Sequence, residues 1–276
     1  SRPSLLNYDL SCGLHGKLRS VPQNYIQRYL LLSTSGINNG WMNYGDLLLQ
    51  IYNKQRPASP LFTNDIITSK LGYFTDTGAY YWYYTEPSKN YQQTLTEVKQ
   101  YHVDNAIPIK YYELDSWWYY KQNNETGEHG GIKWYQPRPE VFPNGFYYMQ
   151  QQVLKTPLIV HHKYYAPDND YQREFKFMGN DQVMVPLQQE FWNFIMSQVK
   201  NWGVVTVIQD WLASVYELSD EATWNVNTGR QYLLQMGDAA KFAGVNLLYC
   251  MPLVSDIISS VENTAVKYIR VSDDYS

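Results

Sequence analysis

The stretch FWNFIMSQVKNWGVVTVIQDWL, residues 191–212, contains one helix and one strand in succession. Its first half places Phe191, Phe194, Ile195 and Val199 at helical spacing, which predicts an amphipathic helix. Its second half, VVTVIQD (204–210), is a short apolar run typical of a buried strand, and it ends on an acid. A helix that leads into a buried strand is the repeating unit of a parallel sheet.

The same unit recurs on both sides of this stretch. Five further apolar runs are expected to be strands: LGYF (71–74), IPIKYYEL (107–114), PLIVHH (157–162), NLLYCMP (246–252) and VKYIRV (266–271). Between them, one helical face carries Leu95, Val98 and His102, and another carries Tyr232, Leu233, Met236, Ala240 and Phe242. Thr228 and Gly244 are placed to cap the second of these helices. Strict alternation of strand and helix predicts a parallel sheet covered by helices.

Polar side chains follow the predicted strands and decide between an open sheet and a closed barrel. They are Asp76, Asp115, His161, His162, Asp210, Asp273 and Asp274. A barrel gathers the carboxyl ends of all its strands around one mouth, whereas an open sheet places its ligand at one switch point. No glycine-rich nucleotide-binding motif follows the first strand. The sequence therefore predicts an α/β fold of the TIM type, a (β/α) barrel.

The barrel is expected to occupy residues 67–276 as the first six of eight βα units. It would be incomplete at the C-terminus. Either the chain is a fragment of a longer polypeptide, or further domains or chains complete the barrel, or the strand count is wrong. The first is favoured, because a barrel that lacks two strands exposes two sheet edges. Residues 1–66 lack the alternation of strand and helix. Their segments LSCGLHGKLRSVP (10–22) and NYIQRYLLLSTSG (24–36) are interpreted as short strands broken by Gly and Pro turns. This β-rich segment is expected to be the end of a β-sandwich domain.

Composition limits the possible partners. With 276 residues, 44% of them hydrophobic, the chain can bury a large core. A net charge of −4 leaves no basic stripe for phosphates, which argues against nucleic acid, and no apolar run is long enough to span a membrane. Cys12 and Cys250 are interpreted as buried thiols. The sequon Asn124-Glu125-Thr126 slightly favours a secreted or lysosomal glycoprotein and leaves the compartment open.

Aromatic residues are abundant and clustered. The 27 Tyr and 9 Trp gather in YYWYY (80–84), YYELDSWWYY (111–120) and FYYMQ (146–150). Aromatic rings stack on the apolar face of a pyranose, so carbohydrate is the expected partner. Trp117 and Trp118 follow Asp115, and Trp211 follows Asp210, which makes all three candidates for sugar binding. An ordinary aromatic core is the alternative explanation for most of these rings.

Two strand ends offer the carboxyl groups that glycoside hydrolysis needs, one to attack the anomeric carbon and one to protonate the leaving oxygen. Asp210 follows one strand, and Asp273 and Asp274 follow the strand two further on. Like-charge repulsion and burial would raise the pKa of the paired acids into the range of a proton donor. The alternatives are a helix cap for Asp210, and a solvated turn or a pair neutralised by Arg270 for the other two.

Four motifs carry a resemblance to a known family: LGYFTDTGAYYW (71–82), YYELDSWWYY, VIQDWL (207–212) and RVSDDY (270–275). In this order they resemble the barrel of the retaining α-galactosidase and raffinose synthase clan of glycoside hydrolases, over residues 70–276. The resemblance implies that Asp210 is the nucleophile and that Asp274, spaced from Arg270 as in the clan, is the acid/base. A Ser-Asp pattern in other members points to Asp273 instead. It also implies that Asp115 holds sugar hydroxyls.

The same resemblance implies a function. The substrate would be an α-galactoside or a related α-glycoside, hydrolysed with retention by double displacement and without a cofactor. A β-sandwich would precede the barrel.

One position departs from the clan, whose members carry a lysine two residues before the nucleophile, where this chain has Ile208. A catalytically inactive barrel that binds carbohydrate or serves as a structural component is therefore the alternative function. Asp76, His161 and Arg270 complete the predicted substrate-binding set. Adjacent strand residues face opposite ways, so only one of His161 and His162 readily faces the mouth. No metal site is predicted, since these histidines lack a third ligand at suitable spacing.

Overall fold

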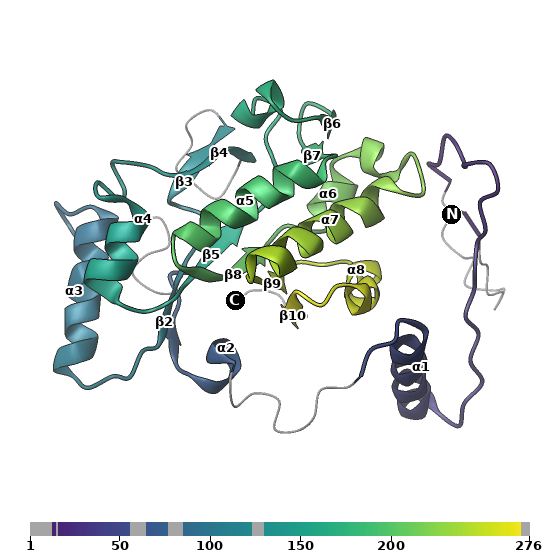
Figure 1. The fold of residues 1–276 in the computed structure, drawn as a ribbon, viewed down its shortest axis with the longest axis horizontal. Coiled ribbons are helices and arrows are strands. Elements are labelled where there is room, and N and C mark those ends of the chain that lie inside the picture. The colour runs from purple at the N-terminus through teal and green to yellow at the C-terminus, as the bar shows by residue number, and fades with distance from the viewer. Residues whose placement is uncertain (1–12, 15, 56–64, 77–84, 123–129, 272–276) are drawn as a thin grey trace.

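The computed structural model of the protein describes residues 13–14, 16–55, 65–76, 85–122 and 130–271. Within them, six parallel strands form one curved sheet (Figure 1): β1 (Gly72–Tyr73), β2 (Tyr111–Leu114), β5 (Leu158–His162), β8 (Val204–Gln209), β9 (Asn246–Tyr249) and β10 (Val266–Ile269). Their order across the sheet is their order in the sequence, so every crossover moves to the next strand in the same direction. This is the arrangement of a (β/α) barrel, here a half-barrel, and the six predicted strands are confirmed.

Helices connect the strands and cover the outer face of the sheet. They are α3 (Tyr91–Asp104) after β1, α4 (Gly145–Tyr148) and the π-helix Met149–Leu154 after β2, α5 (Gln189–Asn201) after β5, and α7 (Thr228–Ala243) after β8. Figure 1 shows α5 and α7 side by side across the sheet. Their buried side chains, among them Trp192, Ile195 and Met236, form one core with Leu158 and Val207 of the strands. The predicted crossover helices are therefore present.

Two phenylalanines that were expected on buried helix faces are exposed. Phe242 lies two residues after the buried Ala240, on the opposite side of α7, and is 87% exposed. Phe194 of α5 is 44% exposed and lies at the edge of the buried face, against the rings of Tyr171 and Phe175. The helical period was right, but the width of each buried face was overestimated.

The ends of α7 follow the predicted caps in part. Gly244 ends the helix with a φ of +67°, as predicted, because glycine has no Cβ to clash in the left-handed region. At the other end, Thr228 is the first helical residue and Asn227 is the cap. The side chain of Asn225 accepts hydrogen bonds of 2.9 Å from the N–H groups of both residues. The capping oxygen therefore comes from an earlier residue than the sequence suggested.

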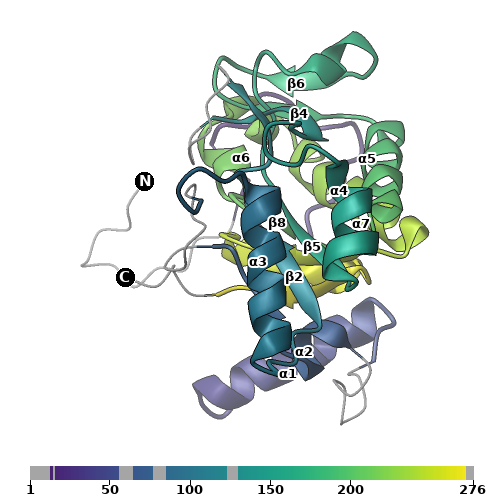
Figure 2. The same cartoon turned by 90° about the vertical axis from the view of Figure 1, so that its left-hand side faces the viewer.

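Two small antiparallel pairs lie beyond the sheet: β3 (Tyr119–Lys121) with β4 (Ile132–Pro137), and β6 (Phe177–Gly179) with β7 (Met184–Pro186). The remaining short segments are α2 (Ile66–Ser69), α6 (Ser214–Glu217), α8 (Val254–Ser259) and the 3-10 turns Asp170–Arg173, Asp220–Thr223 and Ser260–Glu262. Figure 2 shows β4 and β6 at one end of the sheet and α2 at the other. Neither pair was predicted, because each lies in the segment that connects a barrel strand to the next helix.

The inner face of the sheet carries a separate apolar cluster. Strand residues alternate between faces, so Tyr111, Ile159 and Ile208 of neighbouring strands all point inward. They pack with Cys250, and the side chains of Ile66 and Ile67 from α2 cover them. The helix α2 therefore closes the inner face at the amino ends of the strands.

The amino-terminal part differs from the prediction. The described residues between 13 and 55 form one helix, α1 (Ile37–Ile51), and no strand. The strands expected in 10–22 and 24–36 are absent there, because strand-like composition forms a ladder only beside a partner strand. The hydroxyl of Tyr52 donates to Glu262 at 3.1 Å and ties the end of α1 to the barrel. The division of the chain at residue 66 stays a prediction.

In the described part of the chain, no helix combines the length and the apolar character that a membrane crossing requires.

Candidate active site

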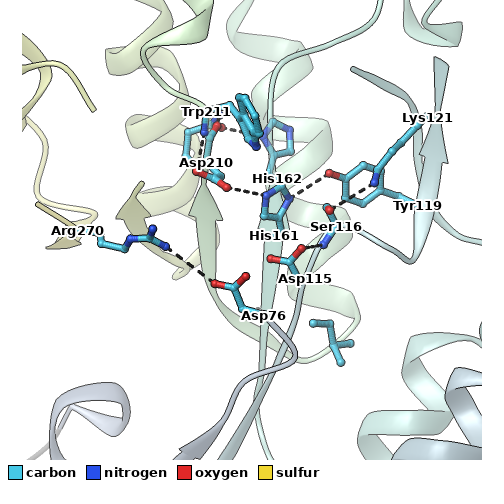
Figure 3. Close-up of polar contacts among 12 residues, drawn as sticks. Asp76, Asp115, Ser116, Tyr119, Lys121, His161, His162, Asp210, Trp211 and Arg270 are labelled. Carbon is cyan, nitrogen blue, oxygen red and sulfur yellow. Dashed lines mark hydrogen bonds and ion pairs between the residues drawn. The ribbon is translucent and has the colours of Figure 1, made fainter. Parts of the chain in front are cut away.

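The carboxyl ends of the strands bring five predicted site residues to one face of the sheet (Figure 3). Asp76 follows β1, Asp115 follows β2, His161 lies near the end of β5, Asp210 follows β8 and Arg270 follows β10. In Figure 3 their side chains point toward a shared space. Carboxylates, a histidine and an arginine at the mouth of a parallel barrel form a place where a polar ligand can be held and transformed.

Asp210 is held in one orientation by its neighbours. Its Oδ2 lies 3.1 Å from His161 Nε2, and its Oδ1 accepts a 2.7 Å hydrogen bond from the backbone N–H of Trp211. The thiol of Cys250 donates to the same carboxylate. Trp211 has a φ of 54°, a left-handed conformation that costs about 1–2 kcal/mol for a residue with a Cβ. Backbone strain of this kind is typical of functional sites.

The carboxyl of Asp210 is ionised. Burial by itself would raise its pKa, but the hydrogen bond and charge interaction with His161, together with the bonds from Cys250 and Trp211, lower the pKa to about 2. Its side chain is 17% exposed. The pKa of the Cys250 thiol is raised, first by burial and then by the charge of Asp210, so this thiol keeps its proton. A largely desolvated carboxylate in a fixed orientation can act as a nucleophile.

His161 is positioned from its other side by β3. The hydroxyl of Tyr119 lies 3.0 Å from His161 Nδ1, so both ring nitrogens of this histidine are engaged. His162 faces the opposite way, with its ring nitrogens 2.7 Å from Gln209 Oε1 and 2.8 Å from Tyr165 Oη. Only His161 therefore faces the candidate site, as the alternation of strand residues requires.

A second polar network joins the ends of β1 and β2. The N–H of Thr75 donates to the carboxyl of Glu113 at 2.9 Å, and its hydroxyl accepts bonds from the N–H of Asp115 at 3.0 Å and from Trp117 Nε1 at 3.2 Å. Burial, and then the charge of Asp115, raises the pKa of Glu113 well above its usual range. The network fixes the backbone that carries Asp115 into the mouth.

Asp76 and Arg270 connect the two outer strands of the sheet. Asp76 Oδ2 lies 3.9 Å from Arg270 Nη1, across the space between the ends of β1 and β10. Both side chains are about one-third exposed, and ion pairs of this kind contribute about 0–1 kcal/mol to stability. The charges of this pair are therefore available to a ligand at little cost to the fold.

The tryptophans separate into two groups. Trp117 and Trp118 are 1% and 0% exposed, and Trp117 stacks on Tyr91 with ring centroids 3.9 Å apart. These two rings belong to the core, which corrects the prediction that they bind sugar. Trp211 is partly exposed beside Asp210, and the buried ammonium of Lys163 lies 4.9 Å from its ring centroid. Of these three rings, Trp211 is the one that a ligand can reach.

Several predicted features lie outside the described residues: the acid/base candidates Asp273 and Asp274, Cys12, the aromatic cluster at 80–84 and the sequon at 124–126. Their relation to Asp210 stays a prediction. In the part of the chain that the structure describes, no group of three His, Cys, Asp or Glu side chains could hold a metal ion.

Four buried residues beside the site were not predicted from the sequence: Glu113, Tyr119, Lys121 and Lys163. Glu113 could have been found, because it lies two residues before Asp115 and period-two alternation places both on one face. Lys121, whose Nζ lies 3.3 Å from Ser116 Oγ, and Tyr119 depend on β3, which the sequence did not reveal. Lys163 directly follows two histidines at a strand end, and this position in the sequence could have indicated it.

The curved parallel sheet and its polar mouth define a (β/α) barrel with a candidate site at the carboxyl ends of its strands. Compared by sequence, the chain matches no known protein family, and no curated protein matches it either. Compared by structure, it is similar to a GH27 β-L-arabinopyranosidase from Geobacillus stearothermophilus, at a TM-score of 0.51 and 13% identity over 74% of this chain and 53% of that enzyme. A variant of that enzyme in complex with arabinose gives a TM-score of 0.52 with the same identity and coverage.

An α-galactosidase from Thermus thermophilus in complex with stachyose is also similar, at a TM-score of 0.48 and 14% identity over 73% of this chain and 43% of that enzyme. The chain thus spans about half the length of these enzymes. At such low identity the likeness concerns the fold alone, and the barrel fold that the resemblance implied is confirmed.

Proposed function

We propose that the protein is a retaining glycoside hydrolase that acts on an α-galactoside or a related α-glycoside. The observation that carries the proposal is the state of Asp210, an ionised and largely desolvated carboxylate that His161 and the Trp211 N–H hold at the mouth of the barrel. Further support comes from the fold, which is similar to that of a GH27 glycosidase.

The reaction proceeds by double displacement. Asp210 attacks the anomeric carbon while the bond to the leaving oxygen breaks, and Asp274 gives its proton to that oxygen. Water then attacks the glycosyl-enzyme ester, loses a proton to Asp274 and releases Asp210. Asp273 is the alternative acid/base. Retention requires the two carboxyl groups to lie about 5–5.5 Å apart.

The described residues also provide contacts for the sugar. Asp115 and Asp76 can accept hydrogen bonds from hydroxyl groups, and Arg270 can donate them. Trp211 supplies an apolar surface beside the nucleophile. All four side chains are partly exposed around the same mouth.

Turnover of a panel of aryl α-glycosides tests the proposal. Asp210→Asn should abolish turnover of any substrate found, whereas the matched variant Asp238→Asn, at an exposed position of α7, should keep it. Asp210→Gly with added azide should then yield a glycosyl azide of inverted configuration, because azide replaces the missing nucleophile. Turnover that survives Asp210→Asn would refute the assignment.

A barrel that binds carbohydrate without hydrolysing it is the second candidate. It is favoured by Ile208, which fills the position of the clan's lysine and points into the apolar cluster of the inner face. Calorimetric binding of a sugar that is never hydrolysed, with the affinity reduced in Trp211→Ala, would establish this function instead of the first.

A further inference from the structure

A cavity of about 610 Å³ lies at the end of the sheet opposite the candidate active site. Four lysines line it: Lys70, Lys99, Lys110 and Lys155. Ser69 of α2 and Thr156 belong to the same lining, and no Asp or Glu is part of it. We refer to it as the lysine pocket.

The topology of the barrel brings these lysines together. Lys70, Lys110 and Lys155 shortly precede β1, β2 and β5, which are neighbours in the sheet. Because parallel strands begin at the same edge, the segments before them meet there. Lys99 reaches the same place from α3. Residues that are far apart in sequence thus converge on one cavity.

The positive charge of the lysine pocket is not balanced within the described residues. None of its four lysines forms an ion pair there, and the acids of α3 are engaged elsewhere, Glu97 with Lys89 and Asp104 with Gln100. Burial and then the nearby ammonium groups of Lys110 and Lys155 lower the pKa of Lys99. Mutual repulsion of this kind is relieved when an anion binds.

The lysine side chains are open to a dissolved ligand. Lys70, Lys110 and Lys155 are exposed, and Lys99 is partly exposed. A cavity with four ammonium groups is suited to oxygen atoms that carry negative charge.

We propose that the lysine pocket binds a small dissolved oxyanion with two or more negative charges, the chemistry of a phosphate or sulfate ester. The site is separate from the proposed glycosidase site, because it lies at the amino ends of the strands. A neutral sugar does not match it, since nothing in such a sugar compensates four ammonium groups. Binding is electrostatic, so it weakens as salt concentration rises.

Isothermal titration calorimetry at low salt tests the proposal with sodium tripolyphosphate, pyrophosphate, orthophosphate and sulfate as probes. The affinity should increase with the charge of the probe. Lys110→Gln should weaken tripolyphosphate binding about tenfold, because one charge-assisted contact is lost. The triple variant Lys99→Gln/Lys110→Gln/Lys155→Gln should abolish it. Urea unfolding without ligand confirms that each variant is folded.

The matched control is Lys241→Gln, an exposed lysine in the last turn of α7, outside the lysine pocket. It should leave tripolyphosphate binding unchanged. An equal loss in this control would show diffuse attraction to the surface and overturn the proposal. Failure of the wild-type chain to bind tripolyphosphate would also overturn it, including the case in which the chain binds vesicles of anionic lipid instead.

Discussion

Replacing Asp210 by Asn should change the way in which the stability of the fold depends on pH. In the folded chain the pKa of Asp210 is about 2, against an ordinary value of 3.8. Because the folded pKa lies below the unfolded one, ionisation of this carboxyl stabilises the fold above about pH 4. The stabilisation is lost as the pH falls toward the folded pKa. The amide of Asn does not titrate, so the variant lacks this contribution.

The size of the effect follows from the difference in pKa. At about 1.36 kcal/mol per pKa unit, the fall from 3.8 to about 2 corresponds to about 2 kcal/mol of preference for the charged form. The amide also changes the contacts with His161 and the Trp211 N–H. Those changes add a constant difference between the free energies of unfolding of the two proteins, and this difference does not depend on the ionisation of Asp210.

Urea unfolding of the wild-type chain and of Asp210→Asn, at pH values between about 2.5 and 7, measures both parts. The difference in free energy of unfolding should be constant above about pH 5 and should shift by about 2 kcal/mol in favour of the variant as the pH falls. His161→Phe should reduce the pH-dependent part, whereas His162→Phe on the opposite face should keep it. A difference that does not depend on pH, or one that His161→Phe leaves intact, would refute the reasoning.

Three further predictions concern the core and the backbone. Cys250 should resist alkylation in the native chain at mildly alkaline pH and react after unfolding in urea, since burial raises the pKa of its thiol; rapid native labelling, followed by peptide mass spectrometry, would contradict this. Trp118→Ala should lower the free energy of unfolding by about 3–5 kcal/mol, and a loss below about 1 kcal/mol in urea titrations would mean that the ring is not in the core. Gly244→Ala should cause no steric clash but should lower the free energy of unfolding by about 1–2 kcal/mol, because alanine is strained at a φ of +67°. An unchanged midpoint of thermal unfolding would contradict the left-handed cap.

The central strands β2, β5 and β8 could be predicted because side chains pack on both of their faces, so that the sequence of each is largely apolar. The run VVTVIQD became β8 for this reason. The pairs β3–β4 and β6–β7 could not be found, because their strands are short and lie within long connections. The segment 24–36 has strand-like composition but no partner strand in the described structure. Pairing is a property of the whole fold, and composition does not record it.

The candidate site was predictable to the extent that it follows from strand ends. Asp210 and His161 follow this rule, and they lie 3.1 Å apart although nearly fifty residues separate them in the sequence. Exposure was not predictable in the same way. Trp117 and Trp118 stand beside Asp115 in the sequence, but the turn that contains them packs into the core. Hydrophobicity indicates what a ring can contact, and only the fold decides whether the contact is solvent, sugar or protein.

The alternation of strand residues explains why the inner face can keep two polar regions apart. His161 lies two residues after Ile159 on one strand, and Asp210 lies two residues after Ile208 on the next, so each polar residue shares a face with the apolar one. An apolar layer therefore lies directly beneath the polar one. The helix α2 covers that apolar layer from below, and the lysine pocket begins at the same helix. The apolar layer thus packs beneath Asp210, whose side chain is 17% exposed. The low pKa of Asp210 therefore depends on a few directed hydrogen bonds, because solvation contributes little to the stability of its charge.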